Sequence, residues 1–170
     1  MPEGHTIHRL SRDLRSDFGG VPVRASSPQG RFENGAGLID GKTLSKSDAW
    51  GKHLFLTFGD RLILHVHLGL IGKFRPHPIE SSPKETVRLR LEGRQAWQLT
   101  GPQKCALVSF DEFVEVSGGL GPDPLRRGSR LNDFVENVSH RRTPIGVSLL
   151  DQSVIAGIGN VYRSEFLFIL

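Results

Sequence analysis

KHLFLTFGDRLILHVHL, residues 52–68, contains two apolar runs separated by Gly59-Asp60. In the second run, apolar residues recur at every second position from Leu62 to Leu68. A two-residue spacer that contains glycine, placed between two such runs, is typical of a β-hairpin because the tight turn brings the strands side by side. The stretch therefore predicts two adjacent antiparallel strands.

Further strand patterns lie on both sides of this hairpin. VPVRAS (21–26) indicates a short strand, and TVRLRLEGRQAWQLTG (86–101) indicates a second hairpin. Because side chains alternate along a strand, Arg88 and Arg90 are expected on the face opposite its apolar residues. CALVSFDEFVEV (105–116) adds one or two strands. Five to seven strands predict a β-sandwich or barrel.

One helix precedes these strands. Ile7, Leu10, Leu14 and Phe18 recur at helical spacing, and Gly19-Gly20 provides a stop signal. The segment that carries these residues, up to Phe18, is therefore expected to form an amphipathic helix that starts close behind the N-terminal Pro-Glu-Gly.

The composition changes at SGGLGPDPLRRGS (117–129), which is typical of a linker. Beyond it, the apolar residues of 131–138 have helical spacing. Thr143 as N-cap and Pro144 at the first helical position then predict a helix over IGVSLLDQSVIA (145–156). The second part of the chain is therefore expected to be helical.

The last helix is expected after GIG (157–159), with Asn160 as the cap of VYRSEFLFIL. Its end, Phe166–Leu170, is entirely apolar. Exposed apolar surface of this kind is typical of a missing partner surface, so we expect this chain to be the front part of a longer protein. The fold class predicted is α+β: an N-terminal helix with a two-layer β-sandwich over residues 1–122, then the start of a helical domain over 123–170.

Composition narrows the class of protein. The chain has 170 residues, 37% hydrophobic and 24% charged, which excludes a disordered chain. Its net charge of +4 is compatible with a polyanionic partner. A single cysteine permits neither an internal disulfide nor a cysteine-rich metal site. No membrane span or signal peptide is indicated, so a cytoplasmic location is expected.

The N-terminus MPEG offers a nucleophile. If Met1 is removed, Pro2 becomes a secondary amine, and α-amino groups have a pKa of about 8, so much of it is neutral at cellular pH. An amine of this kind forms a covalent iminium with a carbonyl-level carbon. Glu3 supplies a carboxyl group beside it for proton transfer. A loose terminus without function is the plainer alternative.

Three more segments carry candidate functional residues. Lys52 follows Gly51 at the start of a strand, where a solvated edge lysine is the alternative. Leu70 and Ile71 lie between two glycines, which suits either an ordinary turn or an apolar wedge of the kind inserted into a DNA stack. Asn160 lies at a helix N-terminus, which suits either a plain cap or a phosphate site.

Taken in order, the motifs MPEG, GKHL, HLGLIG, LGPDPL and LLDQSVIAGIGNVYRSE resemble those of the formamidopyrimidine-DNA glycosylase/endonuclease VIII family. The resemblance covers essentially the whole chain. The start PEGHT is similar to the endonuclease VIII branch, particularly its actinobacterial enzymes. Residues 123–170 would then be the first part of a helix-two-turn-helix DNA-binding domain.

The resemblance implies a base-excision-repair DNA glycosylase and abasic-site lyase that removes oxidised bases, pyrimidines in preference to purines, from damaged double-stranded DNA. Pro2 would attack the sugar C1′, Glu3 would protonate the ring oxygen, and Lys52 would assist proton transfer and contact phosphate. Leu70, with Ile71 beside it, would fill the space left by the flipped nucleotide. Such enzymes are bacterial, cytoplasmic, associated with the nucleoid and monomeric.

Asn160 and Tyr162 would hold backbone phosphate, and Lys104 would also contact DNA. No cofactor or metal is expected in this chain, whereas a zinc finger is expected in the remainder of the full-length protein. By itself the chain is expected to be weak or inactive on damaged bases. The sequence departs from the family pattern at positions that concern damage preference and opposite-base reading, namely Thr6, Gly69, Gly119 and Gln103–Cys105.

Two other classes of function remain open. The chain would be a non-catalytic damaged-DNA-binding protein if Met1 stays on and blocks the amine. It would alternatively be a basic β-barrel that binds nucleic acid such as RNA through exposed aromatic residues. One tyrosine and two tryptophans provide no clear platform for the latter.

Overall fold

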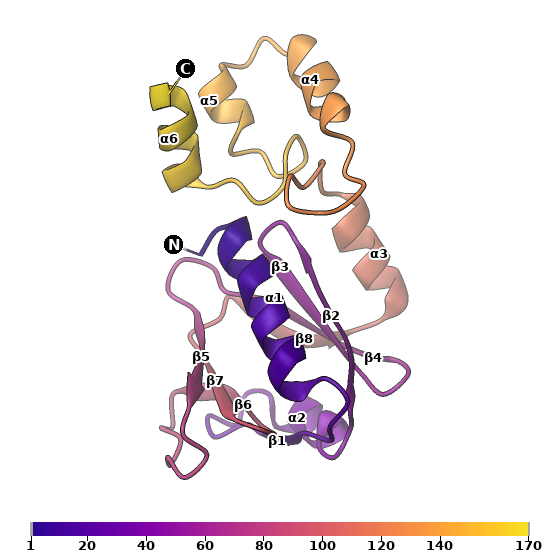
Figure 1. Ribbon diagram of the computed structural model, residues 1–170, viewed down its shortest axis with the longest axis vertical. Helices are drawn as coiled ribbons and strands as arrows, with labels where there is room; N and C mark the ends of the chain where they lie inside the picture. Colours follow the sequence, from indigo (N-terminus) through magenta and orange to yellow (C-terminus); the bar gives the residue numbers. More distant parts are fainter. Residues whose placement is uncertain (1, 170) are drawn as a thin grey trace.

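The computed structural model describes residues 2–169, so the predicted removal of Met1, and Leu170 at the apolar end, lie outside the described residues. A β-sandwich with its helices forms the larger part, and a group of short helices forms the smaller part (Figure 1). The two parts follow one another along the longest axis of the molecule. Among residues 2–169, no helix combines the length and apolarity needed to cross a membrane.

The sandwich consists of two antiparallel four-stranded sheets. In the first, the order is β2-β3-β4-β8, with β2 (Leu44–Trp50), β3 (His53–Phe58), β4 (Leu62–His67) and β8 (Lys104–Val108). In the second, the order is β1-β6-β7-β5, with β1 (Arg24–Ser26), β6 (Val87–Glu92), β7 (Ala96–Thr100) and β5 (Lys73–His77). The α+β fold, the two-layer sandwich and both hairpins predicted from sequence are confirmed.

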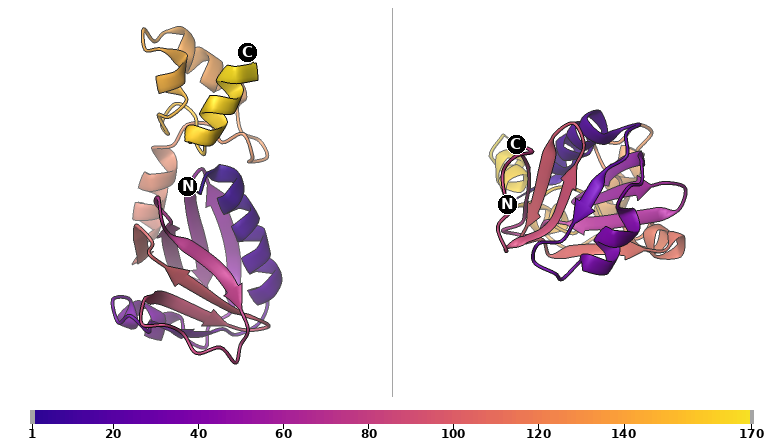
Figure 2. Two further views of the ribbon diagram at one scale, coloured as in Figure 1. Left: turned by 90° about the vertical axis from the view of Figure 1, so that its left-hand side faces the viewer. Right: turned by 90° about the horizontal axis from the view of Figure 1, so that it is seen from below.

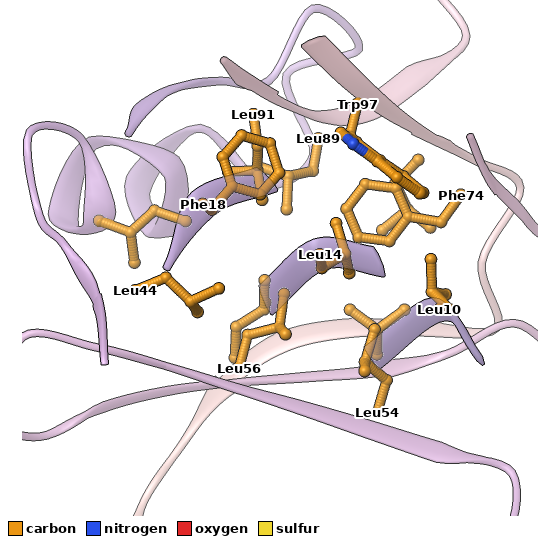
Figure 3. Close-up of a cluster of buried hydrophobic side chains, with 14 of the residues drawn as sticks. Leu10, Leu14, Phe18, Leu44, Leu54, Leu56, Phe74, Leu89, Leu91 and Trp97 are labelled. Carbon is orange, nitrogen blue, oxygen red and sulfur yellow. The ribbon is translucent and has the colours of Figure 1, made fainter. Parts of the chain in front are cut away.

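The N-terminal helix α1 (Gly4–Phe18) packs one face into the sandwich, and its other face is exposed. Its residues Leu10, Leu14 and Phe18 are buried, as their spacing predicted. Figure 3 shows these side chains between leucines of β3 and the apolar side chains of the second sheet, Phe74 and Trp97 among them. Because the buried face of α1 contacts the apolar core that both sheets share, the packing of both sheets sets the position of the chain's N-terminus.

Two strands, β2 and β5, and one helix between β1 and β2 were not predicted. Strand β5 contains Pro76. A proline argues against a strand in a sequence because it has no N–H to donate to a neighbouring strand. β5 is an edge strand, where a proline is tolerated, and with it residues 2–169 contain eight strands instead of five to seven. The unpredicted helix is α2 (Glu33–Ile39), which buries Ala36 and Ile39 against the core.

The prediction of further strands over 105–116 is wrong in its second half. β8 ends at Val108, and the chain continues as helix α3 (Phe110–Gly118). The Ser109 hydroxyl accepts a hydrogen bond from the Glu112 N–H at 3.2 Å, and the Glu112 carboxylate accepts from the Ser109 N–H at 2.7 Å. This capping box, legible as S-x-x-E, starts the helix.

Arg90 was expected on an exposed face of β6, but its side chain is buried. Its guanidinium donates to the carbonyl oxygens of Ser81 (2.8 Å) and Ile79 (2.6 Å) and pairs with Glu92. The loop before β6 covers that face of the strand and supplies these acceptors. The alternation along the strand still holds, and Arg90 is buried because this loop covers the face on which it lies.

In the helical part, α4 (Leu131–Ser139) is confirmed, but α5 (Ile145–Ser148) is far shorter than the helix predicted over 145–156. Pro144 occupies the N-cap position instead of Thr143. After α5, the carboxylate of Asp151 accepts from the N–H and hydroxyl of Ser153, and the Gln152 side chain bonds three backbone groups. These side chains form hydrogen bonds with backbone groups that would otherwise bond within a longer helix, so the helix ends early.

The last helix, α6 (Asn160–Ile169), lies beside the N-terminal end of α1 (Figure 2). Leu149, Ile155 and Ile158 form a small apolar cluster with Tyr162 and Phe134, and this cluster holds the helical part together. The division of the chain at residue 122 stays a prediction.

Candidate active site

An open cavity of about 510 Å³ lies where the start of α1 meets the loop between β4 and β5. Pro2 lines it together with Leu70 and Ile71, which brings the candidate amine and the candidate wedge into one space. Its other walls come from α1, the end of β4 and strand β5, namely Thr6, Leu10, Leu68, Gly72, Lys73, Phe74 and Arg75.

The loop that carries Leu70 and Ile71 is held in a tight turn. Gly69 has a φ of +66°, which L side chains rarely adopt, and the Gly72 N–H donates to the Leu68 carbonyl oxygen at 3.0 Å. Leu70 and Ile71 are 74% and 78% exposed, although both are large apolar side chains. The turn therefore projects them into solvent beside Pro2.

Glu3 is fully buried, and its carboxylate lies against the N-terminus of α6. It accepts hydrogen bonds from the N–H groups of Gly159 (3.0 Å), Val161 (2.8 Å) and Tyr162 (3.3 Å). These are the backbone donors that the sequence assigned to phosphate, with Asn160 as the cap. The assignment of the cap is wrong: Glu3, 156 residues before Gly159 along the chain, caps α6. Asn160 is instead the first helical residue, and its side chain is exposed.

Three glycines make this contact between the two parts possible. The Gly4 N–H donates to the Gly157 carbonyl oxygen at 2.8 Å. A Cβ atom on Gly51 would lie 3.0 Å from Gly157 N, and one on Gly4 would lie 2.9 Å from Gly157 Cα. Gly51 and Gly157 also have positive φ values, +55° and +92°. Backbone thus meets backbone at the site, and no side chain separates the two parts there.

Lys52 follows Gly51 in the turn between β2 and β3 and is half-buried. Burial lowers the pKa of its amine, while the negative charge of Glu3 opposes that shift. Lys52 and Glu3 are therefore close enough to interact electrostatically. An amine whose pKa is lowered releases its proton more easily, which suits the proton-transfer role predicted for Lys52.

The remaining predicted residues lie around this centre. Lys104 is exposed at the start of β8, where it pairs in register with His67 of β4. The Tyr162 ring packs edge-on against His5 of α1, with the ring centroids 5.0 Å apart. Tyr162 therefore joins α6 to α1, in addition to the bond of its N–H to Glu3.

Sequence reasoning missed two sets of residues. Lys73 and Arg75 line the cavity from β5 and add positive charge to it; their alternation with Phe74 was a signal for a strand with one polar face. The second set is a histidine cluster on β3 and β4. In the sequence, two of these histidines were noted only as interruptions of an apolar stretch.

The cluster is centred on His65, which is buried and stacks on Phe55 with centroids 4.5 Å apart. His65 Nε2 lies 2.9 Å from His53 Nδ1, and the buried His65 Nδ1 is without a partner among the described residues. We assign the shared proton to His65 Nε2, because the unpartnered Nδ1 is then an acceptor and not a lost donor. Burial, with His67 nearby, lowers the pKa of His53 to about 4, and burial beside His53 lowers that of His65 to about 3.

Residues 2–169 contain no group of three or more His, Cys, Asp or Glu side chains arranged to hold a metal ion. The described chemistry of the site rests on amines, a carboxylate and apolar side chains.

Comparison with family models matches both parts of the chain. Residues 1–108 match the formamidopyrimidine-DNA glycosylase N-terminal domain, and residues 120–170 match the formamidopyrimidine-DNA glycosylase H2TH domain. The first match ends with strand β8, and the second covers the linker and the helices after it.

Curated relatives extend the same pattern. Endonuclease 8 1 of Mycobacterium tuberculosis is 44% identical over 174 residues, which cover 99% of this chain and 65% of that protein. Formamidopyrimidine-DNA glycosylase of Thermus thermophilus is 30% identical over 180 residues, which cover 99% of this chain and 64% of that protein. The chain thus spans about two thirds of the length of these relatives, slightly less in each case.

Solved structures share the fold. Lactococcus lactis Fpg in complex with DNA that contains an abasic site has a TM-score of 0.76 and 23% identity, covering 97% of this chain and 65% of that one. The wild-type enzyme with N7-benzyl-Fapy-dG DNA has a TM-score of 0.79 and 24% identity, covering 98% and 66%. With the N-terminal domain model matching more than half of its residues, the chain belongs to the formamidopyrimidine-DNA glycosylase family.

Proposed function

We propose that the protein containing this chain is a base-excision-repair DNA glycosylase and abasic-site lyase. The observation that carries this proposal is the single cavity in which Pro2 meets Leu70 and Ile71, with the Glu3 carboxylate buried behind it. A nucleophilic amine beside an exposed apolar wedge suits an enzyme that must extrude a nucleotide to reach its sugar. Family membership and the names of the relatives support the same activity.

In the proposed reaction, the Pro2 amine, free once Met1 is removed, forms a bond with C1′ as the bond from C1′ to the damaged base breaks. The leaving base takes up a proton, and the opened sugar is held as an iminium. Loss of the C2′ proton then expels the 3′ phosphate and cleaves the strand. Glu3 exchanges a proton at the sugar ring oxygen, and Lys52 assists proton transfer and contacts phosphate.

The substrate proposed is damaged double-stranded DNA that carries oxidised bases, with pyrimidines favoured. The preference rests on the 44% identity to an Endonuclease 8 1. Lys73 and Arg75 line the cavity and provide positive charge for the phosphate backbone, and Lys52 and Lys104 are proposed to contact phosphate as well. A monomer in the bacterial cytoplasm that is associated with the nucleoid, with a zinc finger in the full-length protein, completes the proposal.

Borohydride trapping on abasic-site DNA tests this function. An abasic site presents an aldehyde without prior base removal, so the amine alone suffices to form a reducible iminium. We expect a covalent protein–DNA adduct from chain whose mass shows that Met1 has been removed, and a much lower yield from Pro2→Gly, in which a primary amine replaces the secondary amine. An adduct of equal yield from Pro2→Gly, or from chain that retains Met1, would refute Pro2 as the nucleophile. Binding without any adduct would instead favour a non-catalytic damage-binding protein.

A further inference from the structure

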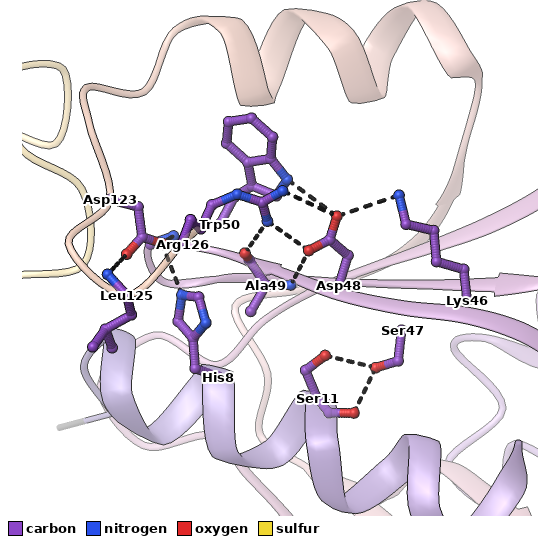
Figure 4. A network of polar contacts seen from close by, with 11 residues as sticks. His8, Ser11, Lys46, Ser47, Asp48, Ala49, Trp50, Asp123, Leu125 and Arg126 are labelled. Atoms are coloured by element: carbon purple, nitrogen blue, oxygen red, sulfur yellow. Dashed lines mark hydrogen bonds and ion pairs between the residues drawn. The ribbon is translucent and has the colours of Figure 1, made fainter. Parts of the chain in front are cut away.

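The linker between the two parts of the molecule contacts the turn that carries Lys52. This turn joins β2 to β3 and contains Gly51 and Lys52. Two linker side chains, Asp123 and Arg126, reach it from opposite ends of a four-residue segment (Figure 4). Both contacts are long-range, so they form only when the linker lies along β2.

Asp123 bonds the backbone immediately before Lys52. Its carboxylate is 3% exposed, and Oδ2 accepts hydrogen bonds from Gly51 N–H at 2.7 Å and from His8 Nε2 at 2.8 Å. Its Oδ1 accepts from Leu125 N–H at 2.9 Å. These bonds hold the pKa of Asp123 below its usual range despite its burial. The carboxylate therefore ties α1, the turn and the linker together at one point.

Arg126 bonds the same turn from its other side. Its guanidinium donates to the Asp48 carboxylate and to the Ala49 carbonyl oxygen, each at 2.5 Å, and lies over the Trp50 ring at 3.8 Å from the centroid. Trp50 in turn donates its indole N–H to Asp48. Every residue from 48 to 51 thus contacts Asp123 or Arg126, and Lys52 is the next residue.

The turn needs such support. Gly51 has a φ of +55° and packs against Ala156 and Gly157 of the helical part, so its backbone has little room to adjust. The Lys52 side chain is half-buried, and the titratable groups that interact with it are Glu3 at the start of α1, His53 of β3 and His67 of β4. A shift of the turn would move its amine relative to Glu3. Reactions that depend on positioning are sensitive to displacements of this kind.

From these contacts we infer that Asp123 and Arg126 are positioning residues for Lys52, through which the linker holds the amine in place beside Glu3. The inference rests on the proposed function for its catalytic consequence, but the placement of Lys52 is testable without DNA. The linker then has two roles: it connects the sandwich to the helical part, which begins in the same segment, and it holds Lys52 in position.

The test compares two arginine-to-alanine variants in the DNA-free chain. Arg126→Ala removes the contacts to the turn, whereas Arg141→Ala removes an exposed ion pair with Asp151 inside the helical part. Acetylation of each lysine by a water-soluble N-hydroxysuccinimide ester is followed by mass spectrometry across pH, with the exposed Lys104 as internal reference. In the unaltered chain, we expect Lys52 to reach half-maximal reactivity at lower pH than Lys104.

In Arg126→Ala, we expect the pH at which Lys52 reaches half-maximal reactivity to rise toward that of Lys104. In Arg141→Ala, we expect this pH to stay unchanged. A Lys52 profile unchanged in Arg126→Ala would overturn the inference, as would an equal shift in both variants. Asp123→Asn provides a second variant. The carboxylate accepts hydrogen bonds from N–H donors at both oxygens, so the NH₂ group of asparagine must face one of these donors and that hydrogen bond is lost. We expect the same upward shift, and an unshifted profile in folded Asp123→Asn would also count against the inference.

Strand cleavage at a ready-made abasic site gives the catalytic readout. We expect Arg126→Ala to cleave roughly tenfold more slowly with an unchanged borohydride adduct yield, because Pro2 is not displaced. If the unaltered chain forms no adduct, the proposed function fails, and the acetylation profiles still decide the inference. If the adduct forms and Arg126→Ala cleaves at the unaltered rate, the catalytic role of the linker is refuted while the function stands.

Discussion

At the scale of single residues, Glu3 joins the two parts of the molecule through one carboxylate. Both of its oxygens accept N–H groups from the start of α6, where the helix dipole also favours negative charge. A Cβ on Gly159 would lie 2.6 Å from Glu3 Cδ, so the carboxylate fits a space that only glycine leaves open. Glu3 therefore has a structural role in addition to the proton transfer proposed for it.

Glu3→Gln is predicted to impair both roles. The amide NH₂ must face one of the N–H donors, which lowers the free energy of unfolding by about 1–3 kcal/mol. Base excision should be lost, since a neutral amide cannot exchange the proton. Thermal unfolding and excision assays on one preparation measure both effects, with Glu85→Gln in an exposed loop as the matched control. Full stability with unaltered excision would contradict both roles.

His53 and His65 predict a loss of stability in mild acid. In the unfolded chain they take up protons near pH 6.5, but in the folded chain only near pH 4 and 3. The unfolded state therefore binds more protons as the pH falls from 6.5 toward 4, and the free energy of unfolding should decrease over that range. The pKa values of Asp48 and Asp123 are lowered in the folded chain, so these carboxylates stabilise it while they are ionised. Their contribution to the free energy of unfolding is lost only below about pH 4.

Urea unfolding between pH 7 and pH 4 measures this effect. His65→Phe should flatten the dependence of stability on pH, because Phe keeps the stacking on Phe55 without titrating. His140→Phe, at an exposed position after α4, is the matched control and should leave the slope unchanged. A slope that is the same in all three proteins would show that the buried histidines do not govern acid stability.

At the scale of elements, the loop between β4 and β5 exposes two large apolar side chains, Leu70 and Ile71. Its glycines form the turn, and Leu70 at the tip loses little contact with the protein if it is shortened. Selection for stability alone does not account for two large apolar side chains in solvent. Their position beside Pro2 is what a wedge requires.

Leu70→Ala is predicted to leave the folding stability nearly unchanged and to weaken engagement of damaged DNA. The flipped nucleotide leaves a gap in the stack that alanine fills poorly. Binding titrations with damaged and undamaged duplexes of one sequence measure the difference, with Leu38→Ala on the exposed face of α2 as control. Equal losses of affinity for the two duplexes would argue against a wedge.

At the scale of the whole molecule, two contacts place the helical part on the sandwich. One is the junction of Gly4, Gly51 and Gly157 with the Glu3 cap, and the other is the linker segment that binds the Lys52 turn. Lys73 and Arg75 of β5 line the cavity and add positive charge to it, although the net charge of the chain is only +4.

DNA affinity is predicted to fall steeply with salt, because phosphate contacts release counterions. Each phosphate contact contributes about 0.9 to the slope of log affinity against log salt, so Lys104→Ala should reduce the slope by about 1. Lys42→Ala, in the exposed turn before β2, should leave it unchanged. Fluorescence anisotropy at a series of salt concentrations measures both slopes. A slope unaltered in Lys104→Ala would remove this lysine from the DNA surface.

The sequence by itself determined the α+β class, the two hairpins and the N-terminal helix. Each of these depends on local periodicity or on a turn of two residues, and such patterns are complete within a short window. The family followed from long motifs in a set order, and the match to its domain models confirms it. Pro2, Lys52 and Leu70 were candidates from their neighbours, their roles came from the resemblance to the family, and those roles stay predictions.

Only the tertiary structure decided which groups meet. The Glu3 cap of α6, the burial of Arg90 and the contact of Asp123 with Gly51 each join segments that are far apart or separated by a loop. The helix expected over 145–156 ended early because polar side chains satisfied its backbone groups instead. A hydrogen-bond donor accepts whichever partner the folded chain brings to it, and local sequence does not specify that partner.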